Sequence, residues 1–524
     1  MKPAETRKLD VAVIGGGLAG NTLVRQLLRA LPGLSMAQFE KTAESDYRVG
    51  ESTVELASNY LVRRLGLSRY MYEEQLPKNG LRYFFDDPTK STYIEEMSEI
   101  GSQSLPFHPS FQLDRGRIDQ DLRRMNVAAG AEVHVDATVQ KLALGEGGAP
   151  HRFEVRAGGR TQRYEAKWVL DASGRAGVIA KAKRLRVKED YHKISAVWGR
   201  FTGVADLDDF GSEAFRARIR HTTRALSTVH FCYAGYWIWF IPIKNGVISV
   251  GVVGDPPRDE PGIRTAEGFV EFLNRHRAVR DLLPGAKLLD VQSFGQLAYG
   301  TTRYFHADRW GMTGEAAAFA DPLYSPGSDF IALENDFLTD LIVRDLAGGE
   351  SDAQRAERTE LYDRFMRFRF EAAMLLYRDA YAFLGSQELM RVKWDFDLAL
   401  YYNLWVSAYM QDLHLDARWL KRELRQERFV LQAMKNFAEL FGKVCRKLEA
   451  DGTYHRANLG GFSFGLEFID CVEEVGKPRT QREVLARTSE IFNSVYLRCR
   501  TLLDEGREAQ AMPLASFMVD RPLA

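Results

Sequence analysis

The chain has 524 residues, 45% of them hydrophobic and 27% charged, a composition typical of a soluble globular protein. Its 71 basic residues balance 71 acidic residues, so it lacks the basic excess that binds nucleic acid or an anionic membrane. The 4 cysteines show no CxxC pair, the 10 histidines show no metal-type spacing, and no apolar run is long enough to span a bilayer. We therefore expect a cytoplasmic protein with reduced cysteines, no metal, and no nucleic-acid or membrane partner.

The N-terminal segment predicts a nucleotide-binding βαβ unit. Residues 9–14 form an apolar strand, residues 15–20 read GGGLAG, and a helix with periodic apolar residues follows. A GxGxxG turn between a strand and a helix lets backbone amides and the helix dipole receive a pyrophosphate. A second strand, 34–39, ends at Glu40, which is placed to bind a ribose hydroxyl pair. These residues predict a dinucleotide site and leave NAD and FAD open.

Later strand–turn units favour FAD. Residues 49–53 read VGEST, residues 168–174 read WVLDASG, and residues 310–317 read WGMTGEAA. Strand–turn units that return to one nucleotide in this way resemble the FAD-binding fold of the aromatic-hydroxylase class. The resemblance implies an α/β fold with a Rossmann-type FAD-binding domain, an interleaved β-sheet substrate region and a helical C-terminal domain. Where that family usually has Gly-Asp in its second motif, this chain has Glu315 after the glycine, which keeps the charge on a longer side chain.

A tryptophan-rich strand is predicted at residues 236–242, which read YWIWFIP. Trp237 and Trp239 project from one face and apolar residues from the other, so we expect the strand to be buried on both faces and to end at Pro242. With a flavin site present, this WxWxIP pattern resembles the signature of flavin-dependent halogenases, and residues 319–327 fit their FxxPxxSxG motif. A tryptophan-rich core strand without that role is the alternative.

The resemblance also implies that Lys78 is the catalytic residue. Residues 51–53 resemble the GEST loop of these enzymes, and their essential lysine follows that loop and opens a strand, as Lys78 does before the apolar residues 81–85. A solvated turn lysine beside Pro77 is the alternative. In the implied reaction, FADH2, O2 and halide give hypohalous acid, and the lysine presents the halogen either as a chloramine or as hydrogen-bonded hypohalous acid.

The resemblance assigns residues to four parts of the site. For the cofactor they are Gly15, Gly17, Ala19, Gly20, Glu40, Lys41, Glu51, Ser52, Arg115, Asp171, Gly314, Glu315, Pro322 and Gly327; for the halide, Ser325, Pro326, Gly327 and Ser328; for the wall between flavin and substrate, Trp237, Trp239 and Pro242; and for the substrate, Tyr324 and Phe85.

The halide loop points to a particular substrate class. Tryptophan halogenases read PLESTG where residues 322–327 read PLYSPG. Tyr324 stands in place of the glutamate that acts on an indole, so a phenol or pyrrole, free or bound to a carrier protein, is the favoured substrate. Pro326 removes one backbone donor from the halide loop.

The composition changes after residue 345. Residues 348–352 read GGESD, and helices are expected over residues 353–384, 387–411 and 417–448. We expect residues 1–345 to form the FAD-binding domain, with the substrate sheet drawn from about residues 78–110 and 190–300. We expect residues 346–524 to form a helical domain whose aromatic residues mostly pack in the core, with a minority lining a substrate pocket.

The sequence therefore predicts a two-component halogenase of secondary metabolite biosynthesis that acts on an electron-rich aromatic. It would use FAD as FADH2, chloride or bromide, O2 and a separate NADH-dependent flavin reductase, as a monomer or homodimer. The alternatives are a single-component FAD-dependent aromatic hydroxylase and a non-catalytic flavin-binding accessory protein.

Overall fold

A computed structural model of the protein describes residues 6–44, 47–465, 467–506 and 509–523. A largely parallel sheet occupies the N-terminal part, in the order β18-β19-β10-β1-β2-β7. Its parallel strands are β1 (Arg7–Ile14), β2 (Met36–Phe39), β7 (Glu132–His134), β10 (Arg160–Asp171) and β19 (Trp310–Met312). Antiparallel additions are β8 (Ala137–Ala143), β9 (His151–Ala157) and β18 (Phe305–His306). The predicted βαβ unit is confirmed, with α1 (Leu18–Ala30) joining β1 to β2.

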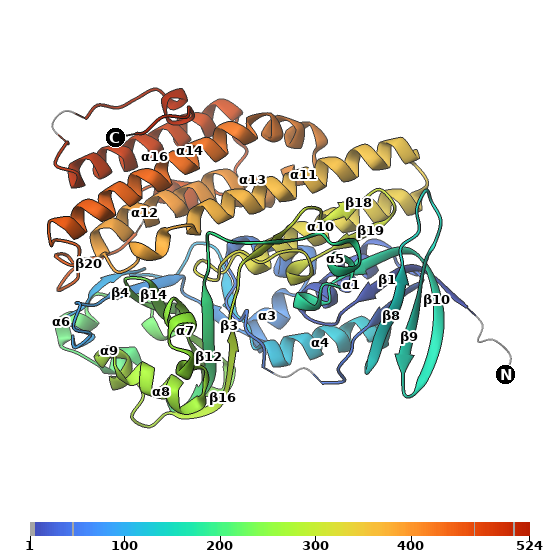
Figure 1. The fold of residues 1–524 in the computed structure, drawn as a ribbon, viewed down its shortest axis with the longest axis horizontal. Helices are drawn as coiled ribbons and strands as arrows, with labels where there is room; N and C mark the ends of the chain where they lie inside the picture. The colour runs from blue at the N-terminus through green and yellow to red at the C-terminus, as the bar shows by residue number, and fades with distance from the viewer. Residues whose placement is uncertain (1–5, 45–46, 466, 507–508, 524) are drawn as a thin grey trace.

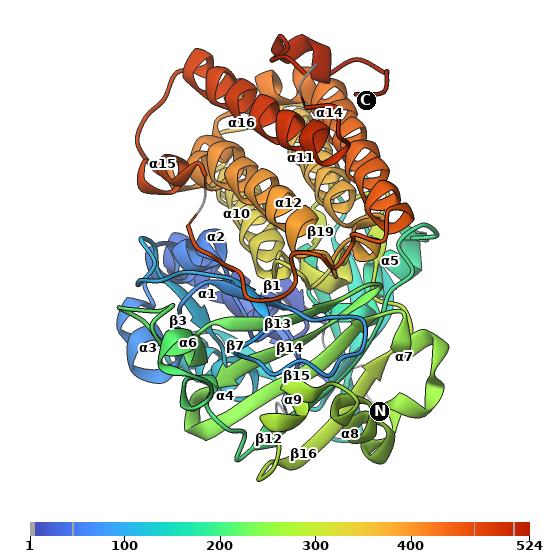
Figure 2. The same cartoon turned by 90° about the vertical axis from the view of Figure 1, so that its left-hand side faces the viewer.

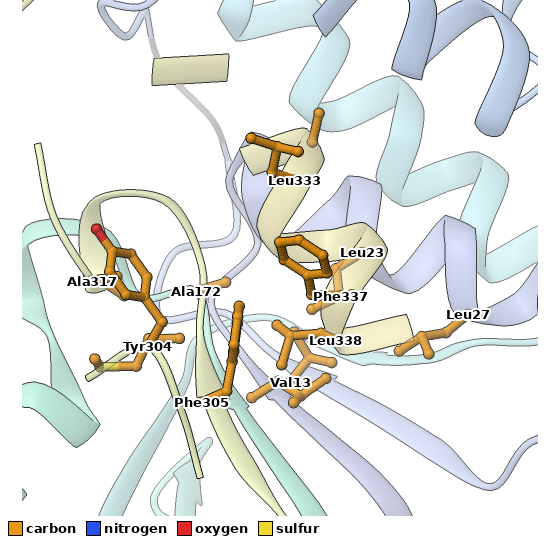
Figure 3. Packing of buried hydrophobic residues seen from close by; sticks show 14 of the residues in the cluster. Val13, Leu23, Leu27, Ala172, Tyr304, Phe305, Ala317, Leu333, Phe337 and Leu338 are labelled. Carbon is orange, nitrogen blue, oxygen red and sulfur yellow. The ribbon is translucent and has the colours of Figure 1, made fainter. Parts of the chain in front are cut away.

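The core of this part fixes where the halide loop lies. Helix α10 (Gly327–Ala347) packs with α1 over the sheet, and Leu23, Leu27, Phe337 and Leu338 of these helices meet Val13 of β1 with no exposed surface (Figure 3). Burial of such side chains contributes roughly 1.5–3 kcal/mol each, so the position of α10 is well determined. The loop that precedes α10 is thereby held beside the GxGxxG turn.

A second sheet contains the tryptophan strand, in the order β16-β12-β15-β14-β13-β4-β5-β20. Its strands are β4 (Leu81–Phe85), β5 (Ser98–Ile100), β12 (Ser195–Thr202), β13 (Thr228–Tyr233), β14 (Tyr236–Ile243), β15 (Val247–Gly254), β16 (Lys287–Phe294) and β20 (Phe462–Ser463). Burial of β14 on both faces is confirmed, because Trp237 and Trp239 join one core cluster and Ile238 and Phe240 join another. The prediction that Pro242 ends the strand is wrong by one residue, since Ile243 still pairs with Val247.

Helices of the C-terminal third form a layer over both sheets (Figures 1 and 2). They are α11 (Asp352–Tyr377), α12 (Gln387–Leu400), a π-helical segment (Tyr401–Val406), α13 (Ser407–Met410), α14 (Ala417–Ala450), α15 (Ile469–Glu473) and α16 (Gln481–Leu502). The first predicted helix was too long, because Asp379 adopts a left-handed φ of 63° shortly after α11 ends. Phe337 stacks on Tyr362 of α11 with ring centroids 4.3 Å apart, so the layer and the first sheet share a core.

Short elements connect these layers. They are α2 (Glu55–Asn59), α3 (Ser68–Glu74), β3 (Leu76–Lys78), β6 (Ser110–Gln112), α4 (Arg115–Ala128), α5 (Val178–Lys183), β11 (Arg186–Lys188), α6 (Glu213–Arg216), α7 (Pro256–Asp259), α8 (Ala266–Asn274), α9 (Arg277–Asp281) and β17 (Tyr299–Thr301). Within the described ranges, no helix is both long and apolar enough to cross a lipid bilayer.

Candidate functional site

The glycine turn after β1 opens a cleft suited to a dinucleotide. Gly15 has a φ of 111°, and a Cβ there would lie 2.2 Å from the Ala172 carbonyl oxygen, so only glycine fits this crossing of β1 and β10. Gly17 precedes α1 without any side-chain cap, which leaves the first amides of the helix available to a pyrophosphate. At the end of β2, Glu40 accepts a hydrogen bond of 2.5 Å from the Gly16 amide.

Some of the predicted cofactor residues line this cleft, Gly20 and Asp171 support it, and Glu51, Ser52, Gly314, Pro322 and Gly327 line a neighbouring cavity instead. Gly15, Gly17, Ala19, Glu40, Lys41, Arg115 and Glu315 line the cleft. Gly20 lies behind the turn, where a Cβ would come within 2.2 Å of the Gly15 carbonyl oxygen. Asp171 is fully buried, and its carboxylate accepts hydrogen bonds from the amides of Ser173 (3.0 Å) and Ile179 (2.6 Å). Asp171 therefore shapes the turn that lines the cleft.

Arg175 is a site residue that the sequence reading missed. Its guanidinium donates to Glu315 at 3.2 Å and to the Gln296 carbonyl at 2.6 Å, and it lies over the Phe294 ring at 4.4 Å. Burial raises the pKa of Glu315, while Arg175 and Arg115 oppose that shift. The longer glutamate side chain is thus held in place by a paired arginine. The sequence did contain a signal for Arg175, because this residue directly follows the predicted strand end and glycine turn at residues 171–174.

A central cavity adjoins the cofactor cleft, and the two share Leu18, Val49, Arg115, Glu315 and Ile331. It is lined by the predicted wall residues Trp237 and Trp239, by the predicted halide residues Ser325, Pro326, Gly327 and Ser328, and by four predicted cofactor residues, Glu51, Ser52, Gly314 and Pro322. His230, which the sequence reading did not single out, also lines it, and burial lowers the pKa of this histidine to about 3, so it is neutral at pH 7. Pro242 lies at the end of β14 and is not among the lining residues.

The halide loop has a constrained backbone. Ser325 adopts a left-handed φ of 56°, and its amide donates to the Pro322 carbonyl at 3.0 Å. Pro326 precedes α10 without a side-chain cap, so the first amides of that helix are free of side-chain partners, as at an anion site. Within the described ranges, Ser328 Oγ and Trp198 Nε1 are buried without a hydrogen-bond partner, and Ser328 lines the central cavity while Trp198 lines the cofactor cleft. These unpaired polar atoms fit a site that holds polar ligands.

Both indoles of the wall are fixed by hydrogen bonds. Trp237 Nε1 donates to the Tyr381 hydroxyl at 3.0 Å, and that hydroxyl donates to Asp321 at 2.9 Å. Trp239 Nε1 donates to Ser249 Oγ at 3.2 Å, and its ring covers Gly251, where a Cβ would lie 2.3 Å from the ring. The two rings thus form a rigid surface of the central cavity.

Lys78 is the last residue of β3 and is only 1% exposed. Its ammonium donates to Ser52 Oγ at 2.8 Å and to the Thr53 carbonyl at 2.7 Å. Burial lowers the pKa of Lys78 to about 8, although the carboxylates of Glu55 and Asp329 raise it in part. A solvated turn residue is excluded, and Lys78 is buried, but it ends β3 and pairs with Ser110 of β6, so the prediction that it opens the strand at residues 81–85 is wrong.

A third cavity lies within the helical layer and shares Pro326 and Phe330 with the central one. Tyr324, which was predicted to contact the substrate, lines this cavity and donates to Asp397 at 2.8 Å. Phe85, by contrast, is fully buried in the core cluster around Trp237 and lines neither this cavity nor the central one. Val54 and Glu55 line the helical cavity, whereas Ser52 lines the central one. The loop that binds Lys78 therefore runs between the two cavities.

Two charged residues of the helical cavity were not found from the sequence. Asp329, in the first turn of α10, accepts hydrogen bonds of 2.9 Å from the Ala57 amide and from the Tyr401 hydroxyl. Burial raises the pKa of Asp329 to about 7. Arg369 of α11 lies over the Trp405 ring at 3.3 Å. The sequence offered no specific signal, because Arg369 is one of many charged residues in α11 and Asp329 lies in the first turn of α10, where an acidic residue is common. In the described part of the chain, no group of three or more His, Cys, Asp or Glu could hold a metal ion.

The chain is similar in sequence to two proteins that are named as halogenating enzymes. The chain is 28% identical over 439 residues to the flavin-dependent halogenase chlA of Dictyostelium discoideum, which covers 78% of this chain and 71% of the relative. It is 27% identical over 349 residues to the 1H-pyrrole-2-carbonyl-[peptidyl-carrier protein] chlorinase of Pseudomonas fluorescens, covering 61% of this chain and 72% of that protein.

Solved structures with a similar fold include two halogenases. CmlS, a flavin-dependent halogenase, aligns with a TM-score of 0.58 and 21% identity over 82% of this chain and 72% of its own. Halogenase PltM aligns with a TM-score of 0.66 and 16% identity over 97% of this chain and 98% of its own. The FAD binding domain family matches residues 8–327, from the glycine turn through the halide loop. Because this match spans more than half of its length and the cleft fits FAD, the chain belongs to the FAD binding domain family.

Proposed function

We propose that the protein is an FADH2-dependent halogenase that makes hypohalous acid from halide and O2 and transfers the halogen through Lys78 to an electron-rich aromatic. The observation that carries this proposal is that buried Lys78, at the end of β3, hydrogen-bonds to the loop that runs between two cavities, while two fixed tryptophans line the cavity next to the cofactor cleft. The similarity to relatives that are named halogenases supports the reaction class.

The residues of the cleft would hold FAD, which when bound and reduced supplies the oxidising power through its reaction with O2. Gly15 and Gly17 would bind the pyrophosphate and Glu40 the ribose, with Arg115 and Glu315 where the cleft meets the central cavity. The halide would bind beside Ser325 and the first amides of α10. Trp237 and Trp239 keep an organic substrate in the helical cavity away from the cofactor, because their rings are bulky and fixed by hydrogen bonds.

Lys78 can act in either protonation state. With a pKa of about 8, roughly one lysine in ten is a neutral amine at pH 7. The ammonium can donate a hydrogen bond to hypohalous acid, whereas the amine reacts with it to give an N-haloamine and water. In the second case the arene attacks the halogen, the ring loses a proton, and the amine is restored. Ser52, which accepts a hydrogen bond from Lys78, lines the central cavity through which hypohalous acid would arrive.

The partners follow from this chemistry. A separate NADH-dependent flavin reductase would supply FADH2. The substrate would be a phenol or a pyrrole, free or bound to a carrier protein, because Tyr324 hydrogen-bonds to Asp397 where a tryptophan halogenase has a free glutamate. The relatives include both a pyrrole-carbonyl chlorinase and a tryptophan 2-halogenase, so the preference for a phenol or pyrrole rests on Tyr324.

The test supplies the purified protein with a flavin reductase, NADH, O2, chloride or bromide, and panels of phenols and pyrroles, with products read by mass spectrometry. Halogenated product is expected, and Lys78→Ala is expected to abolish it while oxidation of FADH2 continues. Lys188→Ala is the control, because that lysine is exposed and distant in sequence from the site. NADPH oxidation without a reductase, giving hydroxylated product, would instead identify a single-component hydroxylase.

A further inference from the structure

Arg369 differs from the other buried arginines of the described chain. Arg82, Arg200, Arg224 and Arg355 each form an ion pair of 3.1 Å or less with a carboxylate. Arg369 is only 8% exposed, yet within the described ranges no carboxylate lies within 4.0 Å of it and no group accepts a hydrogen bond from it. A buried guanidinium presents five donors and stays charged, so leaving it unpaired is costly.

None of the carboxylates that the structure describes around the helical cavity forms an ion pair with Arg369. Asp329 is the carboxylate with the largest electrostatic effect on Arg369, but both of its oxygens already accept hydrogen bonds, from Ala57 and Tyr401. Asp397 is paired with Lys393 at 2.5 Å. Glu55 and Glu423 also line the cavity but form no ion pair with Arg369. The donors of Arg369 are therefore left for a ligand.

The surroundings of Arg369 suit an aromatic ring. The guanidinium lies over the Trp405 ring, and Ala372, Ala373, Leu376 and Tyr377 line the same cavity. Val54 and Glu55, which follow the carbonyl that binds Lys78, line it as well. A ring bound through one polar substituent at Arg369 would occupy the cavity that reaches the loop of the halogenating lysine.

We propose that Arg369 binds an anionic oxygen of the substrate, either a carboxylate or an ionised phenol oxygen, so that the substrate is an acidic aromatic compound. This inference rests on the proposed function, because it assigns the substrate class of the same site. A planar guanidinium binds such oxygens through paired hydrogen bonds. A carboxylate would anchor the ring, whereas a phenolate would also activate it toward the electrophilic halogen.

The test measures binding, which does not depend on turnover. Calorimetric titration of the FAD-loaded protein would use 3,5-dihydroxybenzoate, its methyl ester and 3,5-dimethoxybenzoate. The wild type is expected to bind 3,5-dihydroxybenzoate more tightly than the ester or than the dimethoxy acid, and Arg369→Gln is expected to weaken that binding about tenfold or more. If the carboxylate is the anion, the loss affects both acids and spares the ester. If the phenolate is the anion, the loss affects the two dihydroxy compounds and spares the dimethoxy acid.

Two further measurements keep the result interpretable. Arg364→Gln is the matched control, since Arg364 lies on the same helix, pairs with Glu427 at 2.7 Å and does not line the cavity. The midpoint of thermal unfolding of ligand-free Arg369→Gln is expected to equal or exceed that of the wild type, because an unpaired buried charge is removed. Equal binding of every ligand by wild type and Arg369→Gln, or equal affinity of the wild type for all three compounds, would overturn the inference. Halogenation is scored separately, so absence of turnover with retained anion binding would reject only the proposed function.

Discussion

Lys78 donates its two hydrogen bonds to neutral oxygens, those of Ser52 and Thr53. Burial therefore dominates, and the pKa of Lys78 falls from 10.5 to about 8 despite the nearby carboxylates of Glu55 and Asp329. The folded chain thus releases this proton at a lower pH than the unfolded chain. Between these two pKa values the unfolded state binds more protons, so the contribution of Lys78 to stability rises with pH.

The difference in unfolding free energy between wild type and Lys78→Met is expected to shift in favour of the wild type by up to about 3 kcal/mol as the pH rises from 8 to 10.5. Below pH 8 the difference should level off, because both states of the wild type are then protonated. Urea unfolding at a series of pH values measures it, with Lys188→Met as the exposed control. A difference that does not vary with pH would show that the folded-state pKa is not depressed.

At the scale of residues, several residues predicted from short sequence patterns do line a cavity in the structure. Ser52, Ser325 and Tyr324 were predicted because each belongs to a short pattern, and the structure places each of them on a cavity. Arg369 and Asp329 could not be predicted, because they lie on different helices and become cavity residues only through tertiary packing. Nothing in the sequence distinguishes Arg369 from the many other charged residues of α11.

At the scale of elements, β14 depends on its neighbour β15. Trp239 pairs with Gly251 across the ladder, and the indole lies directly over that glycine. Any side chain at position 251 would meet the ring, so the absence of a Cβ there is what allows the wall to lie flat. The sequence indicated the two tryptophans and the burial of both faces of β14. It did not indicate Gly251, because the register of two strands is set by the turn between them.

Gly251→Ala is expected to lower the unfolding free energy by about 1–3 kcal/mol, because the added methyl group would sit 2.3 Å from the Trp239 ring and displace it. Urea unfolding gives the stability, and tryptophan fluorescence of the native protein reports the altered wall. Gly262→Ala serves as control, since no atom lies within 4 Å of a Cβ placed there. Equal losses in the two variants would mean that the wall tolerates displacement.

At the scale of the whole molecule, the C-terminal third completes structures that begin near the N-terminus. Strand β20 pairs with β5, and α11 stacks on α10, so the helical layer is joined to both sheets. The sequence predicted a change of character near residue 345 and three long helices, because helical periodicity and glycine boundaries are local signals. It could not predict β20, a two-residue strand whose only support is pairing with a distant segment. Buried side chains such as Asn458 hold these distant segments together.

Asn458 is fully buried and joins the sheet to the helical layer. Its Nδ2 donates to the carbonyls of Asp86 (2.6 Å) and Gly385 (2.7 Å), and its Oδ1 accepts from the Gln387 amide (3.0 Å). Asn458→Ala leaves three buried backbone groups unpaired and is expected to lower the unfolding free energy by about 1–3 kcal/mol.

The unfolding of Asn458→Ala also tests whether the helical layer and the sheets unfold together. Because Asn458 connects both parts, urea transitions followed by tryptophan fluorescence and by far-ultraviolet circular dichroism are expected to coincide and to shift together in Asn458→Ala. Asn274→Ala, at an exposed position at the end of α8, is expected to leave both transitions in place. Two separate transitions, of which only one responds to Asn458→Ala, would instead show that the helical layer folds independently of the sheets.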